Sequence, residues 1–144
     1  MEVEGKIAMQ YVSILIDPVL SHSYIYPKVI ESYSLKKGKH GNPWLVQPAI
    51  GTKIKVSEMV ERCTMMLNEI TTHADLNVLP LGSYDVLIDM DWLEEHRAKL
   101  DCYNKILECI NDEGRPQLVR GMLKKVSIRQ ISTLQLGSFF KKNC

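Results

Sequence analysis

Apolar residues recur along this chain in short stretches that turn-forming residues interrupt, and few stretches are long enough for a helix. Within most of them apolar and polar positions alternate with a period near two, which is typical of half-buried strands. Strands or strand-like apolar runs are expected at residues 6–16, 44–49, 53–60, 62–68, 76–79, 84–88, 99–101, 106–110 and 117–122. The pattern therefore predicts an all-β domain.

Two segments depart from this pattern and predict one or two short helices. Residues 27–34 open with Pro27, which suits the first position of a helix. Asp89 precedes the stretch MDWLEEHR, and an acid at that place can cap a helix N-terminus. Between them, the turn Ile50-Gly51-Thr52 separates two strand segments and predicts a hairpin.

The apolar pattern changes after residue 122. In the stretch VSIRQISTLQL, Ile128, Ile131 and Leu134 are three residues apart, as on one side of a short helix. We interpret residues 123–144 as a connector toward a further region and residues 1–122 as the folded domain. The last residues, FFKKNC, contain two aromatics that the pattern does not explain, so we expect the chain to be part of a longer polypeptide.

Composition narrows the classes of function. The 144 residues suit one domain, and the net charge of +1 gives no electrostatic reason for a nucleic-acid or anionic-membrane partner. No apolar run approaches the roughly 20 residues of a membrane span, and the N-terminus lacks a signal-peptide plan. The sequence therefore predicts an intracellular, cytoplasmic protein.

The four cysteines do not suggest a metal site or a disulfide framework. They are scattered through the chain without any CxxC pair: Cys63, Cys102, Cys109 and Cys144. We expect reduced, mostly buried thiols.

One acid stands out, in the stretch LIDPVLSHSYI. Asp17 follows the apolar run VSILI and precedes Pro18, so its carboxylate would lie in surroundings that disfavour its charged form. Asp-Pro commonly opens a turn, and Asp17 could simply accept a backbone N–H there. The alternative is that the carboxylate is buried for its chemistry.

Several segments together resemble the protease region of plant gypsy-class LTR retrotransposon polyproteins, a branch of the retropepsin-like aspartic proteases. LIDPVLSHSYIYPKVIE is similar to that family's catalytic segment, and DLNVLPLGSYDVLIDMDWLEEHRAKLDCYNK is similar to its second apolar-apolar-glycine motif and the helix that follows. GNPWLVQPAIGTKIKV falls where the family has its flap hairpin, and VSIRQISTLQL resembles the lead-out toward reverse transcriptase.

The resemblance implies a retropepsin-like acid protease barrel with one lobe per chain, which works as a homodimer on a polypeptide substrate. Asp17 corresponds to the catalytic aspartate, one from each subunit, and no metal or cofactor is required. The flap tip corresponds to Ala49, Ile50, Gly51 and Thr52, and the second motif to Leu87, Ile88 and Asp89.

The sequence departs from the family pattern where the chemistry is most demanding. Pro18 stands in place of a Ser/Thr whose hydroxyl bonds across the dimer, and it also removes a backbone donor. Val19 replaces a glycine and Leu20 an alanine, and both add volume beside the carboxylates. Asp89 replaces the glycine of the second motif, although it could turn outward to cap the helix.

Two functions of different classes follow. The chain is either an aspartic endopeptidase whose activity is weakened or lost, or a catalytically inactive retropepsin-fold module that dimerises or holds extended peptides.

Other candidate residues for catalysis or binding are weaker. His22 has no assignable partners for a serine triad, Trp44 and Trp92 suit core or flap packing, and three further acids lack a Ser/Thr-Gly behind them: Asp85, Asp91 and Asp101.

Overall fold

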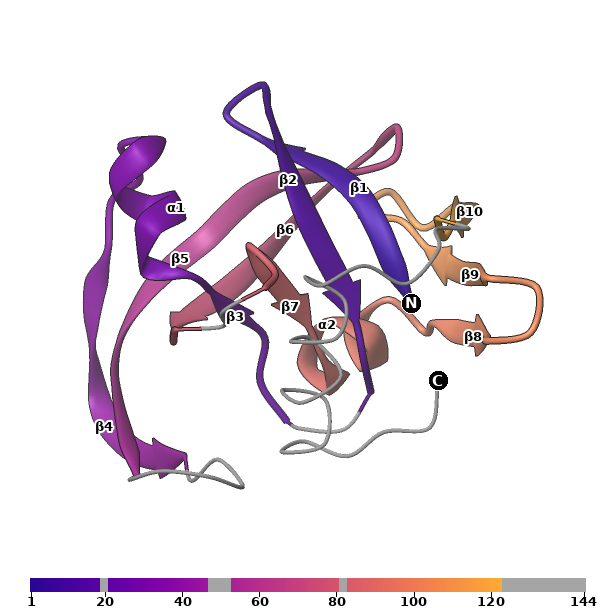
Figure 1. The fold of residues 1–144 in the computed structure, drawn as a ribbon. Coiled ribbons are helices and arrows are strands. Elements are labelled where there is room, and N and C mark those ends of the chain that lie inside the picture. The colour runs from indigo at the N-terminus through magenta and orange to yellow at the C-terminus, as the bar shows by residue number, and fades with distance from the viewer. Residues whose placement is uncertain (19–20, 47–52, 81–82, 123–144) are drawn as a thin grey trace.

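The computed structural model describes residues 1–18, 21–46, 53–80 and 83–122, and it is built mostly of strands (Figure 1). Seven strands form one sheet in the order β1-β2-β7-β3-β6-β5-β4, and β1 also pairs with β5. This last pairing closes six of the strands into a barrel and leaves β4 as an added edge strand. The strands of this sheet are β1 (Glu2–Ile7), β2 (Gln10–Ile16), β3 (Tyr24–Ile25), β4 (Gly38–Val46), β5 (Ile54–Leu67), β6 (Ile70–Val78) and β7 (Val86–Ile88).

Closure of the barrel depends on close approach at one glycine. Gly5 pairs with Val12 on β2 and with Leu67 on β5, so β1 bridges the two ends of the sheet. A Cβ at Gly5 would collide with the Met66 carbonyl oxygen and with the side chain of Ile14. Glycine is therefore required where β1 crosses β5.

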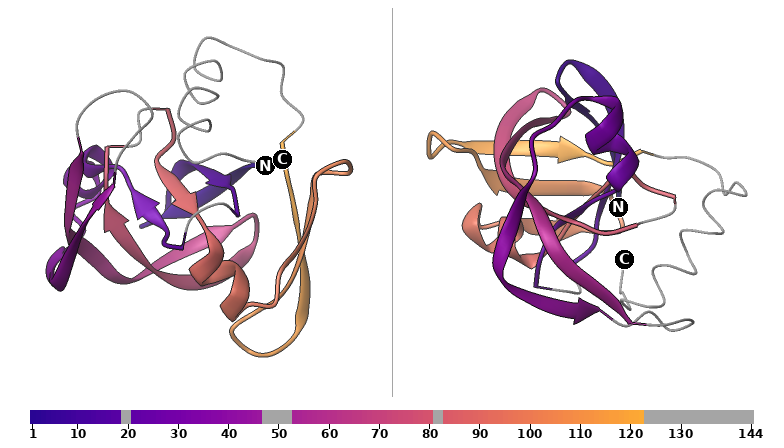
Figure 2. Two further views of the ribbon diagram at one scale, coloured as in Figure 1. Left: turned by 90° about the horizontal axis from the view of Figure 1, so that it is seen from below. Right: turned by 90° about the vertical axis from the view of Figure 1, so that its left-hand side faces the viewer.

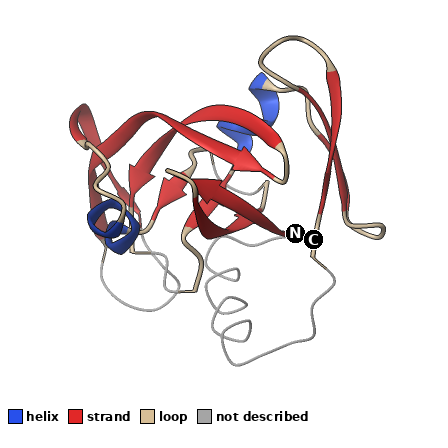
Figure 3. Cartoon of the chain, turned by 90° about the horizontal axis from the view of Figure 1, so that it is seen from above, coloured by secondary structure: helices blue, strands red, loops and turns tan. Residues whose placement is uncertain are grey.

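A second, three-stranded sheet stands beside the barrel (Figure 3). It contains β8 (Lys99–Asp101), β9 (Ile106–Ile110) and β10 (Pro116–Arg120), in the order β10-β9-β8. The two further views show helix α2 (Met90–Glu95) leading from the barrel into this sheet (Figure 2). The other helix, α1 (Pro27–Ser32), begins at the expected proline.

The prediction of an all-β domain with two short helices is confirmed. The expected hairpin around residues 50–52 is present as the antiparallel pair β4–β5, although its tip lies outside the described residues. Two details differ. Residues 6–16 contain a turn at Ala8 and Met9, both with positive φ, and residues 53–60 and 62–68 belong to one long strand, β5.

β5 continues through residues 61 and 62 because a bulge accommodates them within the strand. No local pattern in the sequence predicts this bulge. The pairing with β6 shifts between Val60 and Cys63, and Arg62 adopts a φ of 45° there. Its N–H donates to Asp75 Oδ1 at 2.7 Å, so the bulged backbone keeps a partner. The polar pair Glu61-Arg62 is therefore absorbed within the strand.

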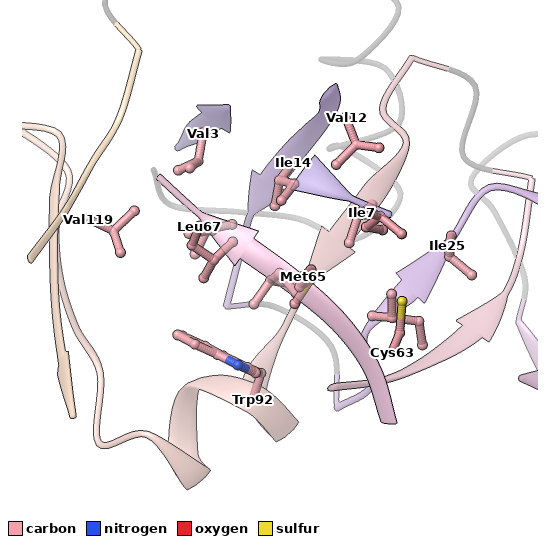
Figure 4. Close-up of a cluster of buried hydrophobic side chains, with 14 of the residues drawn as sticks. Val3, Ile7, Val12, Ile14, Ile25, Cys63, Met65, Leu67, Trp92 and Val119 are labelled. Carbon is pink, nitrogen blue, oxygen red and sulfur yellow. The ribbon is translucent and has the colours of Figure 1, made fainter. Parts of the chain in front are cut away.

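The core lies between the barrel wall, α2 and the second sheet (Figure 4). Alternate residues of the strands point inward, as the period of two requires. From the barrel Ile14 and Leu67 are fully buried, and from the second sheet Leu107 and Val119 are fully buried as well. The ring of Trp92 reaches from α2 toward Leu67 and Val119 and joins the two parts.

The cysteines follow the expectation only in part. Cys63 and Cys109 are free and buried, and burial raises the pKa of Cys63 to about 11, so its thiol stays protonated and unreactive at neutral pH. Cys102, in contrast, is disulfide-bonded, so the prediction of reduced thiols is wrong at this position. Cys144 and the predicted connector, residues 123–144, lie outside the described residues.

Neither helix in the described part of the chain is long and apolar enough to cross a membrane.

Candidate active site

Asp17 lies directly beyond the last residue of β2, at one end of the barrel. β2 and β7 run parallel with Ile16 opposite Ile88, and the Asp17 N–H donates to the Ile88 carbonyl at 3.1 Å. Asp17 is 5 % exposed, so the carboxylate is held in a largely desolvated position by the sheet ladder. A buried acid fixed in this way is a candidate for chemistry rather than for solvation.

A cation lies near Asp17. The Met1 ammonium donates to the Ile16 carbonyl at 2.9 Å. Burial lowers the pKa of this ammonium, and the charge of Asp17 opposes that effect.

The second motif meets the first through the same ladder. Leu87 and Ile88 are buried on β7, and Asp89 follows them at the N-cap of α2. The Asp89 carboxylate accepts from the Met90 N–H at 2.8 Å, which confirms the predicted cap. The side chain does not turn outward, however, because Asp89 is fully buried.

Ser23 connects these two motifs, and sequence analysis missed its role. Its hydroxyl accepts from the Asp89 N–H at 2.9 Å and donates to Asp91 Oδ1. Its own N–H donates to Asp91 Oδ2 at 2.9 Å. Asp91 therefore binds the segment after Asp17 to the start of α2, across 68 positions of sequence.

The remaining acids that could be mistaken for a second catalytic group have other roles. Asp85 accepts from the Ser13 N–H at 2.8 Å and so fixes the start of β7 against β2. Asp101 is exposed at the β8–β9 turn, where hydrogen bonds from the backbone and side chain of Asn104 lower its pKa. Neither acid lies at the end of β2 with Asp17.

The arm of the β4–β5 hairpin is packed against the same end of the barrel. Trp44 on β4 stacks on His22 with ring centroids 4.5 Å apart, and His40 meets its edge at 4.9 Å. Trp44 also packs against a small core cluster that contains Tyr24 and Leu87. The hairpin therefore lies over the strands that carry both motifs.

Of the four positions that differ from the family pattern, the structure describes Pro18 and Asp89. Pro18 is half-buried and lines an apolar hollow of about 290 Å³ together with Met90 and Leu93 of α2. Val19, Leu20 and all four residues of the expected flap tip, 49–52, lie outside the described residues. Among the residues that the structure does describe, no group of three or more His, Cys, Asp or Glu could hold a metal ion.

Comparison with known proteins agrees with this geometry. Residues 4–115 match the profile of a family described as retroviral aspartyl protease, and this span includes Asp17, the hairpin and Asp89. The fold is similar to the crystal structure of the retroviral protease-like domain of Ddi1 from Leishmania major, with a TM-score of 0.59. That likeness covers 86 % of this chain and 97 % of the other at 15 % identity, so it supports the fold alone. No curated protein matches the chain.

Proposed function

Because this chain belongs to the retroviral aspartyl protease family, we propose that it is the retropepsin-like protease domain of a retrotransposon polyprotein, with peptide-bond hydrolysis weakened or lost. The observation that carries the proposal is the place of Asp17, buried at the end of β2 and held by the ladder to β7. Resemblance of the flanking segments to gypsy-class polyproteins supports the retrotransposon origin.

The proposed reaction needs two chains, each with one Asp17. Two carboxylates brought close together share one proton, because both cannot ionise comfortably. The ionised aspartate takes a proton from water as the resulting hydroxide attacks the scissile carbonyl carbon, and the protonated aspartate gives its proton to the leaving amine. The proton count of the pair is restored, and one water is consumed for each bond cut.

Two features support weakening rather than preservation of this chemistry. Pro18 has no N–H and no hydroxyl, so it cannot donate where the family pattern has a Ser or Thr. Val19 adds a β-branched side chain where the family has glycine. The Asp89 departure, in contrast, is accommodated, since its carboxylate caps α2. The scaffold can therefore persist while the site fails, which favours the second candidate, an inactive dimerisation or peptide-binding module.

We expect the protein to be a homodimer, because half of an aspartate pair is useless for this chemistry. Light scattering at tens of micromolar, roughly the range of weak interfaces, should give twice the mass of the chain. The Asp17→Asn variant is the control and should give the same mass. A strictly monomeric protein at that concentration would contradict the paired-aspartate proposal.

We expect the unaltered protein to cleave a peptide library weakly or not at all between about pH 4 and pH 7, the range in which a shared-proton pair works. Any cleavage should disappear in Asp17→Asn, which keeps the side-chain shape but cannot act as the ionised base. Robust cleavage that Asp17→Asn abolishes would show an intact enzyme and overturn the weakened site. Cleavage that survives the substitution would overturn the assignment of Asp17.

A further inference from the structure

A buried histidine joins the second sheet to the barrel. His96 is the C-cap residue of α2 and is 3 % exposed. Its Nδ1 lies 2.9 Å from the Trp92 carbonyl oxygen, and its Nε2 lies 2.8 Å from Asp112 Oδ1 in the turn between β9 and β10. The imidazole also stacks on the Trp92 ring, with centroids 4.1 Å apart and planes 18° apart.

Counting donors shows which form of this ring satisfies its two acceptors. A carbonyl oxygen and a carboxylate can only accept, so each of these two contacts needs an N–H from His96. A neutral imidazole carries one N–H and would turn a lone pair toward the other oxygen at less than 3 Å. Only the imidazolium, with two N–H groups, satisfies both acceptors.

A proton on Asp112 would be the alternative, but its surroundings oppose that. Oδ2 of Asp112 lies 2.9 Å from His73 Nδ1, so the carboxylate faces two histidines. Burial raises the pKa of Asp112, but hydrogen bonds from His73 and His96, with their charges, outweigh burial and lower it. Asp112 therefore stays ionised until the pH falls below the usual aspartate value of about 3.9.

The other groups around the cluster do not provide His96 with a different partner. Thr72 on β6 accepts from Trp92 Nε1 at 3.0 Å, and its Oγ1 lies 3.3 Å from His96 Nε2, which is longer than the contact to Asp112. A polar hollow of about 320 Å³ adjoins the cluster, and its lining includes one further cation and one further acid, Arg62 and Glu95. His73 is about one-third exposed and has one acceptor, so it can donate to Asp112 in either protonation state.

We propose that His96 is a protonated clamp that fixes the β9–β10 turn to α2 and β6 in acid solution and releases it when the ring loses its proton. This inference is independent of the proposed function, because it concerns only the attachment of the second sheet. The Ile110 N–H also donates to the His96 carbonyl at 2.8 Å, so β9 stays attached and release loosens the turn locally.

The sign of the pH dependence follows from the two partners. Only a ring with two N–H groups donates to both oxygens, so the clamp holds while both nitrogens carry a proton and is lost when one is removed. Asp112 contributes above its unfolded pKa, and its contribution is lost as the pH falls through the lowered folded value. The clamp therefore requires a doubly protonated His96 ring together with an ionised Asp112.

The test compares the unaltered chain with His96→Gln, which keeps one amide donor but has no titrating proton. At pH 5 we expect the variant to melt about 4–8 °C lower, in the range that a loss of this kind gives for a small domain, and the gap should shrink at pH 8. The matched control is His73→Gln, whose gap from the unaltered chain should change less with pH. A gap for His96→Gln that is the same at pH 5 and pH 8 would overturn the proposal.

A second measurement uses the unaltered chain and does not depend on a variant that folds. Nitrogen NMR of the histidine rings at pH 5 should show one buried ring with both nitrogens protonated, and hydrogen exchange of the β9–β10 turn should speed up as that ring deprotonates beyond the ordinary pH dependence of exchange. A buried ring with a single N–H at pH 5, or turn exchange that does not follow the ring, would overturn the proposal.

Discussion

Asp91→Ala is expected to lower the free energy of unfolding by about 3 kcal/mol, since it leaves buried donors without their acceptor. The Asp91 carboxylate accepts from the N–H and hydroxyl of Ser23 and from the Trp92 N–H. Ser23 is fully buried, so water cannot readily replace the carboxylate. Urea denaturation should show a lower midpoint with an unchanged slope.

Two matched variants test the cause of this loss. Asp91→Asn keeps the side-chain shape and one accepting oxygen, so its loss should fall between those of the unaltered chain and Asp91→Ala. Asp101→Asn changes an exposed acid that accepts hydrogen bonds from Asn104 in its own turn, and it should have a smaller effect than either Asp91 variant. If Asp91→Ala costs no more than Asp101→Asn, the Ser23–Asp91 contact does not hold the two motifs together.

The second sheet and α2 could be predicted closely from the sequence. The expected strands at residues 99–101 and 106–110 have the bounds found in β8 and β9. Both are short alternating runs separated by a polar turn, so local pattern decides them. Asp89 predicted the start of α2 in the same way, because N-capping is a contact between residues that are close in sequence.

The barrel strands were less predictable where tertiary contacts override local chemistry. The bulge in β5 depends on Asp75 reaching Arg62 from 13 residues away, and nothing in the Glu61-Arg62 pair shows that partner. The turn between β1 and β2 uses Ala8 and Met9 at positive φ, where a glycine or asparagine would have marked it.

The residues of the candidate site were likewise predictable only where the local sequence decides their position. The apolar run before Asp17 was enough to identify a buried acid at a strand end, and the family resemblance supplied its meaning. The contacts of Ser23 with Asp89 and Asp91 depend on the parallel pairing of β2 with β7, which brings Ile16 beside Ile88 across 72 positions. The only local signal was a small hydroxyl residue between His22 and the buried Tyr24.

Pro18→Ser combined with Val19→Gly is expected to raise cleavage of a polyprotein-derived peptide at mildly acid pH by at least about 100-fold, which corresponds to roughly 2.7 kcal/mol of activation free energy. The serine restores a hydroxyl and a backbone donor beside Asp17, and the glycine removes a side chain where the family's turn approaches the carboxylates. Each single change should give less than half of the gain in activation free energy that the double variant shows. Both changes act on the same loop geometry, so their effects should couple.

The measurement is the rate of peptide cleavage by the unaltered chain, the two single variants and the double variant, each checked for its mass in solution. Adding Asp17→Asn to the double variant is the control, and it should abolish the gained activity while the dimer persists. If the double variant stays dimeric and does not cleave, Pro18 and Val19 are not the cause of the weakened site. The obstacle would then lie at Leu20 or at Asp89, whose fully buried carboxylate is fixed at the start of α2.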